Sequence, residues 1–175
     1  MMASKTLLGT KNKFNTAVKT QSQFSAGLTA LPIKKIQANI GLTCNLECRH
    51  CHVASSPRRT EQMSWAVMRQ IIDIAVDHDI PLVDITGGAP EINPHFRKFV
   101  QTLAEAKINV LVRTNLTVML QPGFEDLPQF YKDHSVNLVA SLPCYLEDNV
   151  TAQRGEGVYN ESVEVIKRLN ALGYG

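Results

Sequence analysis

Hydrophobic and polar residues along the chain follow two periods in turn, which predicts strands alternating with helices. Four short apolar segments have the length and composition of strands: 35–42, 82–86, 109–112 and 136–142. Each precedes a segment with a helical spacing of apolar residues, and these lie after Ser64, after Asn93, at about 125–132, and between Val163 and Leu172. Such alternation predicts a parallel sheet with right-handed crossovers.

Four strand–helix units amount to half of a β/α barrel. We therefore expect an α/β fold, a partial TIM-type barrel of about four units, left open because the chain stops where a fifth strand would begin. Ser64 is expected to cap the first helix and Asn93 the second, and Gly173 to follow the last one. The core domain is expected to span residues 35–175.

Residues 1–34 are expected to form an irregular N-terminal extension. The first 31 residues are rich in Ser, Thr, Lys, Asn and Gln and contain no acidic residue. A transit peptide has a similar composition, but this segment also lacks arginine and an apolar stripe. An irregular extension and a targeting segment both stay open at this point.

Composition narrows the classes of function. The 175 residues are 44% hydrophobic and 19% charged, with a formal net charge of +2. This small charge does not indicate a nucleic acid or a membrane surface as partner, and no apolar run approaches the ~18 residues of a membrane span. Three of the four cysteines are clustered, which indicates a reducing compartment, and we expect the cytoplasm.

The clustered cysteines, Cys44, Cys48 and Cys51, form a C-x3-C-x2-C motif directly after the first predicted strand. Thiolates are soft ligands that select iron–sulfur clusters, zinc or copper(I). Three thiolates on a 4Fe-4S cluster leave one iron open for another ligand. A zinc site with four protein ligands, a thioredoxin-like C-x2-C pair and three spare thiols are the alternatives.

Unusual residues also follow the other three strands. Gly87-Gly88 ends the second, Asn115 follows the third, and Ser141 lies at the end of the fourth. In parallel β/α sheets, active-site groups lie at the carboxyl ends of the strands, so these residues are expected to share one rim with the cysteines. The glycines would let backbone approach a ligand closely, or simply make a tight turn.

Together, the cysteine motif and the Gly-Gly motif resemble those of the radical S-adenosylmethionine (SAM) superfamily. The resemblance implies that Cys44, Cys48 and Cys51 ligate a 4Fe-4S cluster whose open iron is chelated by SAM. Reductive cleavage of SAM then gives a 5′-deoxyadenosyl radical, with flavodoxin or ferredoxin as electron donor. Gly87, Gly88 and Glu91 occupy the positions of the motif that contacts the SAM amino group, although Ala89-Pro90 separates Glu91 from the glycines.

A narrower resemblance, to the arsenosugar-biosynthesis branch, rests on six short motifs spread over the core. They are Cys-Arg-His-Cys-His-Val (48–53), Arg-Thr-Glu-Gln-Met (59–63), Asp-Ile-Thr-Gly-Gly-Ala-Pro-Glu (84–91), Asn-Leu-Thr-Val (115–118), Ser-Leu-Pro-Cys-Tyr (141–145) and Gln-Arg-Gly-Glu-Gly-Val (153–158). The branch implies a methylated arsenical as small-molecule substrate. Another radical SAM reaction, on a peptide or a cofactor, is the alternative, and a zinc-binding interaction module is the alternative from another class.

Further candidates each have two interpretations. Asn115 and Ser141 would hydrogen-bond the ribose or carboxylate of SAM, or cap the loops that follow them. Arg154 would pair with the SAM carboxylate, or lie on the surface. Cys144 is a substrate-side thiol or a small buried residue, and His50 and His52 shield the cluster sulfurs or bind a metal.

Overall fold

The structure of the chain is a computed structural model that describes Ala17 and residues 31–175. The chain divides into two compact units, Met1–Ile33 and Lys34–Gly175, and the second contains every element discussed below. The expected irregular extension and the targeting segment fall almost entirely outside the described residues. The predicted boundary between an N-terminal extension (1–34) and the core domain (35–175) therefore stays a prediction.

The second unit is built on a four-stranded parallel sheet in the order β1-β2-β3-β4. The strands are β1 (Ile36–Asn39), β2 (Leu82–Thr86), β3 (Asn109–Thr114) and β4 (Asn137–Ala140). The helices are α2 (Trp65–Asp77), α3 (Phe96–Glu105), α4 (Leu127–Asp133), α5 (Glu147–Arg154) and α6 (Val158–Ala171), with the 3-10 turns η2 (Pro90–Ile92) and η3 (Thr117–Leu120). The predicted α/β fold with an open parallel sheet is confirmed.

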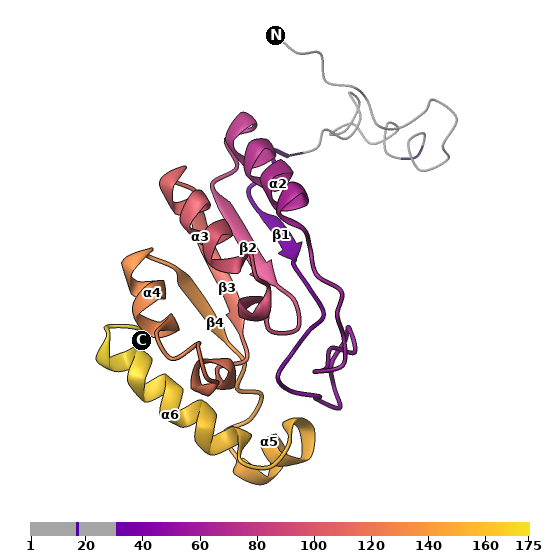
Figure 1. The fold of residues 1–175 in the computed structure, drawn as a ribbon, viewed down its shortest axis with the longest axis vertical. Coiled ribbons are helices and arrows are strands. Elements are labelled where there is room, and N and C mark those ends of the chain that lie inside the picture. The colour runs from indigo at the N-terminus through magenta and orange to yellow at the C-terminus, as the bar shows by residue number, and fades with distance from the viewer. Residues whose placement is uncertain (1–16, 18–30) are drawn as a thin grey trace. The chain divides into compact units, whose positions relative to one another are not determined.

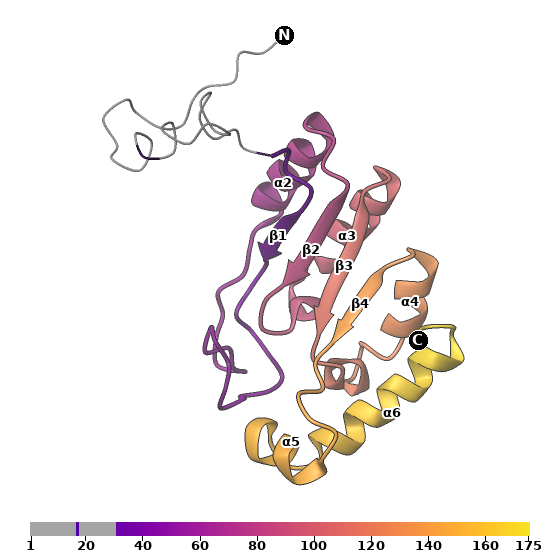
Figure 2. The same ribbon diagram turned by 180° about the vertical axis from the view of Figure 1, so that it is seen from behind.

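Helices α2, α3 and α4 cover one face of the sheet (Figure 1). The other face, seen in Figure 2, carries no helix within the described part of the chain. The cysteine loop between β1 and α2 lies with α5 at the carboxyl ends of the strands (Figure 2). Among residues 31–175 no helix is long and apolar enough to cross a membrane.

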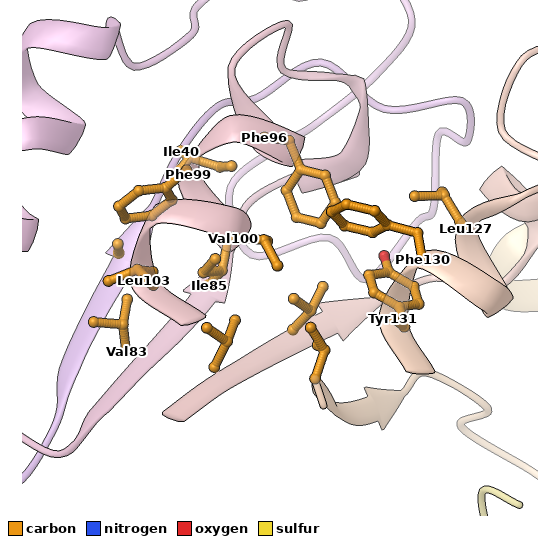
Figure 3. Packing of buried hydrophobic residues seen from close by; sticks show 14 of the residues in the cluster. Ile40, Val83, Ile85, Phe96, Phe99, Val100, Leu103, Leu127, Phe130 and Tyr131 are labelled. Carbon is orange, nitrogen blue, oxygen red and sulfur yellow. The ribbon is translucent and has the colours of Figure 1, made fainter. Parts of the chain in front are cut away.

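Alternate residues of each strand point into the core between sheet and helices. Val83 and Ile85 of β2 are fully buried and face Phe99 and Leu103 of α3 (Figure 3). Farther along, Phe96 meets Tyr131 edge to face, with ring centroids 6.2 Å apart and planes at 87°. Aromatic pairs favour this geometry, which fixes α4 against α3.

The helix ends partly follow the predictions. Ser64 occupies the N-cap position of α2, although its side chain makes no capping hydrogen bond, and Gly173 follows the last helix with a φ of +96°. Asn93 does not cap α3, because the chain first makes the turn η2 and the helix begins at Phe96. The Asn93 side chain instead accepts a hydrogen bond from the His95 N–H at 2.8 Å.

Two features near the C-terminal end differ from the expectations. Helix α5 was not expected, because Val150 is its only large apolar residue. In α6 the buried apolar positions are Val158, Val165 and Leu169. Of the predicted face, Leu169 is buried, whereas Val163, Ile166 and Leu172 are half-buried. The helix begins at Val158, directly after Gly157, and its buried side is shifted toward Val158 and Val165.

Candidate functional site

A cavity of about 480 Å³ opens at the carboxyl ends of the strands. The residues that line it come from the cysteine loop, from all four strand ends and from α5. They are Gln37, Asn39, Cys44, Leu46, Cys48, His50, Cys51, His52, Val53, Ser55, Thr86, Gly87, Gly88, Arg113, Asn115, Ser141 and Arg154. The four strand ends therefore contribute to one cavity wall, as predicted, and eight of the nine predicted site residues line it.

The three clustered thiols reach this cavity from one loop. Cys44 is the most buried, and burial raises the pKa of its thiol, with Cys48 and Cys51 adding to the rise as neighbouring charges. Its Sγ accepts hydrogen bonds from the Leu46 N–H at 3.4 Å and from Asn115 Nδ2 at 3.5 Å. These donors partly offset the cost of a thiolate in a buried position.

Cys51 lies in a tighter turn. The Ser55 N–H donates to its Sγ at 3.3 Å. Partial burial acts to raise the pKa of Cys51, but the backbone N–H groups of Ser55, Val53 and Ala54 outweigh it, so the pKa is lowered. A lowered pKa favours the thiolate, which is the form that binds metal.

The spacing of the thiols differs between a single ion and a cluster. Within residues 31–175 and at Ala17, no three His, Cys, Asp or Glu side chains converge closely enough to hold one metal ion. One zinc ion would draw sulfurs to about 2.3 Å from a common centre. A cubane instead takes each thiolate on a different iron, which needs wider spacing. Three thiols on one cavity wall, two of them (Cys44 and Cys51) with N–H donors, fit a 4Fe-4S cluster better than a mononuclear site.

Gly87 and Gly88 pack directly against the start of the cysteine loop. A Cβ atom on Gly88 would lie 2.5 Å from the Thr43 carbonyl oxygen, and one on Gly87 would lie 2.7 Å from the Gly41 oxygen. The N–H groups of Gly88 and Ala89 donate to these two oxygens, each at 2.9 Å. The absence of side chains is therefore required by the fold, whatever ligand the glycines contact.

The glycines also keep polar groups free for a ligand. Among the described residues, none donates a hydrogen bond to the carbonyl oxygens of Gly87 or Gly88. Carbonyl oxygens on a cavity wall suit a ligand ammonium group, which carries only donors.

Asn115 joins the end of β3 to the cysteine loop. Its Nδ2 donates to Asn45 Oδ1 at 2.6 Å as well as to the Cys44 sulfur, and its Oδ1 accepts from the Val118 N–H at 3.0 Å. The side chain thus caps the turn η3 and holds the loop. A contact from Asn115 to SAM stays a prediction.

Arg154 is not a surface residue. It is 5% exposed, and its guanidinium donates to the carbonyl oxygens of Ser141 and, at 3.0 Å, of Asn115. It therefore ties α5 to the ends of β3 and β4. The Arg49 N–H also donates to the Gln153 oxygen at 2.9 Å, so α5 is attached to the cysteine loop as well.

Glu91 does not line the cavity, contrary to the expectation from the glycine motif. Ala89-Pro90 starts the turn η2, which directs Glu91 into the core, where its Oε1 accepts a hydrogen bond from the Tyr131 hydroxyl at 2.9 Å. Oε2 has no partner among the described residues, and burial raises the pKa of this carboxyl. Its place favours a structural role.

The remaining candidates separate in the structure. His50 and His52 line the cavity beside the thiols, whereas Cys144 does not. The Cys144 sulfur accepts from the Leu146 N–H at 3.4 Å and from Asn149 Nδ2 at 3.3 Å, which lowers its pKa. Its predicted roles stay untested.

Some wall residues, among them Gln37 and Asn39, were missed by sequence reasoning. Both belong to the polar alternates of β1. The alternation of side chains along the strand was the signal that would have found them, because every second residue of a strand faces the same side of the sheet.

Comparison with known proteins identifies the class. The family model "Radical SAM superfamily" matches residues 38–175, and the chain belongs to this superfamily. It is accordingly an enzyme domain whose cofactors are a 4Fe-4S cluster and SAM.

The chain is 29% identical over 152 residues to mycofactocin maturase MftC of Mycobacterium tuberculosis, covering 87% of the chain and 38% of MftC. It is 25% identical over 131 residues to the antilisterial bacteriocin subtilosin biosynthesis protein AlbA of Bacillus subtilis, covering 74% of the chain and 29% of AlbA. The chain thus spans about a third of the length of these relatives.

Among solved structures, Streptococcus suis SuiB bound to S-adenosylmethionine has the same fold. The TM-score is 0.67 at 18% identity, over 91% of this chain and 35% of SuiB. SuiB bound to its precursor peptide SuiA gives a TM-score of 0.70 at 16% identity, over 99% of this chain and 39% of that one.

Proposed function

We propose that Cys44, Cys48 and Cys51 ligate the 4Fe-4S cluster, and that the cavity wall beside them binds SAM. The observation that carries this proposal is the convergence of the three thiols, the Gly-Gly backbone and Arg154 on one cavity. When bound, the reduced cluster and SAM supply a 5′-deoxyadenosyl radical by reductive cleavage.

The residues of the chain have separate tasks in this scheme. The carbonyl oxygens of Gly87 and Gly88 accept hydrogen bonds from the SAM ammonium group. Asn115 holds Cys44 in place, and Arg154 fixes the ends of β3 and β4 so that the cavity keeps its shape. A flavodoxin or ferredoxin delivers the electron, in the reducing environment of the cytoplasm.

Anaerobic reconstitution with iron and sulfide tests the ligand assignment. Wild-type protein is expected to bind about four irons per chain and to release 5′-deoxyadenosine from SAM on reduction. Cys51→Ala should lose both. Cys144→Ala is the matched control, since Cys144 is the fourth free cysteine and does not line the cavity. If Cys51→Ala kept its iron, the assignment would be refuted.

For the substrate we propose a methylated arsenical, to which the 5′-deoxyadenosyl group is joined in arsenosugar biosynthesis. The six motifs between Cys48 and Val158 support it. Incubation with SAM, excess reductant and dimethylarsinate should give a product whose mass contains both arsenic and the 5′-deoxyadenosyl group. SAM cleavage without that product would refute the arsenical as substrate but leave the proposed cluster and SAM site unaffected.

Peptide modification is the second candidate. It is supported by the relatives MftC and AlbA and by the SuiB structure with its precursor peptide. In the same assay, a reductant-dependent mass change in a precursor peptide, with the arsenical unchanged, would favour this candidate.

A further inference from the structure

Polar and charged side chains from three neighbouring strands, together with Lys35 just before β1, meet on the face of the sheet that carries no helix in the described chain. Asp84 of β2 accepts hydrogen bonds from Arg113 of β3, at 2.8 Å from Nε and 2.9 Å from Nη2. Gln37 of β1 donates to the same carboxylate at 3.2 Å, and Lys35 Nζ lies 3.3 Å from it. The register brings Gln37 and Asp84 level with each other, with Arg113 farther toward the cavity.

Burial of the Asp84 carboxylate at this position costs free energy. Its side chain is 0% exposed, and a buried carboxylate is tolerated only when it is paired and hydrogen-bonded. An apolar residue at a buried strand position is often as stabilising as an ion pair. Stability therefore does not explain the Asp84–Arg113 pair, and we attribute it to the orientation that Asp84 gives to the Arg113 guanidinium. The two-point contact fixes the plane of the Arg113 guanidinium.

This contact leaves part of Arg113 unused. Nε and Nη2 bind Asp84, and Nη1 has no hydrogen-bond partner within the described residues. The side chain is 41% exposed and lines the cavity. In contrast, the other arginine of the wall, Arg154, is engaged by two carbonyl oxygens.

The charge around Arg113 is positive. Lys35 and Arg113 together exceed Asp84 by one positive charge, and no Asp or Glu lies on the described cavity wall. The facing residue on β4 is Val139, which is 39% exposed and gives the neighbourhood an apolar side. An anionic group attached to a small apolar body suits this environment.

We propose that Arg113, oriented by Asp84, binds a singly charged oxyanion of the substrate through Nη1. The inference rests on the proposed function in one respect, namely that this cavity holds the substrate. The shared chemistry is a carboxylate or a methylated oxyacid of arsenic. A peptide supplies the first and a methylated arsenical the second.

Binding of two small probes to the 175-residue chain tests the site. The probes are dimethylarsinate and N-acetylglycine at a pH where both are ionised, followed by calorimetry or by the arginine side-chain N–H signals in NMR. Arg113→Gln is expected to weaken the better probe by about tenfold or more, since a hydrogen bond to a charged group is lost. The tighter probe identifies the source of the oxyanion.

Arg97→Gln is the matched control. Arg97 of α3 also makes a two-point contact with a carboxylate, from Nη1 and Nη2 to Asp126 at 2.9 and 2.6 Å, and is 36% exposed, but it does not line the cavity. Its loss should leave probe binding unchanged. Arg113→Lys covers the case in which Arg113→Gln does not fold, because the lysine ammonium still neutralises Asp84. The ammonium lacks the planar set of donors with which a guanidinium binds two partners at once, so probe binding should again fall.

The proposal is overturned if Arg113→Lys or a folded Arg113→Gln binds both probes like wild type. It is also overturned if SAM displaces both probes, since Arg113 would then belong to the cofactor site. Failure of the proposed function gives a different result, namely wild-type protein without iron or 5′-deoxyadenosine. The comparison of probe binding between variants stays valid in that case.

Discussion

Replacement of Gly88 by alanine is predicted to disturb the cysteine loop more than it disturbs the fold. Gly88 is not among the residues with positive φ, so alanine can adopt its backbone conformation. The obstacle is steric, because the new Cβ would lie 2.5 Å from the Thr43 oxygen, 2.9 Å from Ser55 Oγ and 3.0 Å from the Leu42 oxygen. Two of these three atoms belong to backbone directly before Cys44.

The magnitude follows from three contributions. The Thr43 oxygen has to move by roughly 1 Å to reach ordinary contact distance, and overpacking of this kind costs about 1–3 kcal/mol. The hydrogen bonds from the Gly88 and Ala89 N–H groups are strained, at about 1 kcal/mol each if lost. Lower entropy of the unfolded chain returns about 0.4–1 kcal/mol. The net loss is about 2 kcal/mol, which a domain with about 5–15 kcal/mol survives.

Urea unfolding and iron content after reconstitution measure the two effects separately. Gly123→Ala is the control, since Gly123 has a φ of +87° and no atom within 4 Å of a Cβ, so only backbone strain of about 1–2 kcal/mol is added. Both variants should lose similar stability, but only Gly88→Ala should lose iron. Wild-type iron content in Gly88→Ala would refute the argument that the glycine positions the cysteine loop.

Three further predictions concern buried polar residues. Tyr131→Phe leaves the Glu91 carboxyl without its partner and should lower the free energy of unfolding by about 1–3 kcal/mol in urea titrations; an unchanged midpoint would contradict this. Because burial raises the pKa of Glu91 above 4.5, the stabilisation by its protonated form is complete below that pH and lost as the pH rises through the folded-state value. Glu91→Gln should therefore gain stability relative to wild type as the pH rises above the ordinary carboxyl value of 4.5, whereas parallel pH profiles would count against it. Asn93→Ala removes donors to the Ile40 and Met63 oxygens, at 2.8 and 3.0 Å, and should cost about 2 kcal/mol in thermal unfolding, with little change speaking against the role.

The alternation of apolar and polar residues was sufficient for the sheet but not for its ends. The strand predicted over 35–42 stops at Asn39, because the Asn39 side chain accepts from the Gly41 N–H and the following backbone turns to pair Gly41 with Gln62. Local side-chain hydrogen bonds of this kind compete with the ladder, and apolar periodicity does not report them.

Residues whose burial depends on distant partners were beyond prediction from local pattern. Helix α5 is mostly polar, and Arg154 anchors it by bonds to residues 13 and 39 positions away. Glu91 was assigned to the site by resemblance to the Gly-Gly-Glu motif of the superfamily, but the turn η2 directs it into the core. The thiols and the glycines could be placed at the cavity because each motif is local in sequence and follows directly after a strand.

The two faces of the sheet explain why the fold and the site depend on the same residues. A parallel sheet covered on both faces has apolar side chains on both. Here the helix-covered face carries Val83 and Ile85, whereas the other side of β2 carries Asp84 and Thr86. The second face of this sheet is therefore polar at β2. The end of β2 then supplies the glycine pair that holds the cysteine loop. A change at this strand end therefore alters the packing of the loop and the geometry of the thiols together, and Gly88→Ala separates this coupling from general loss of stability.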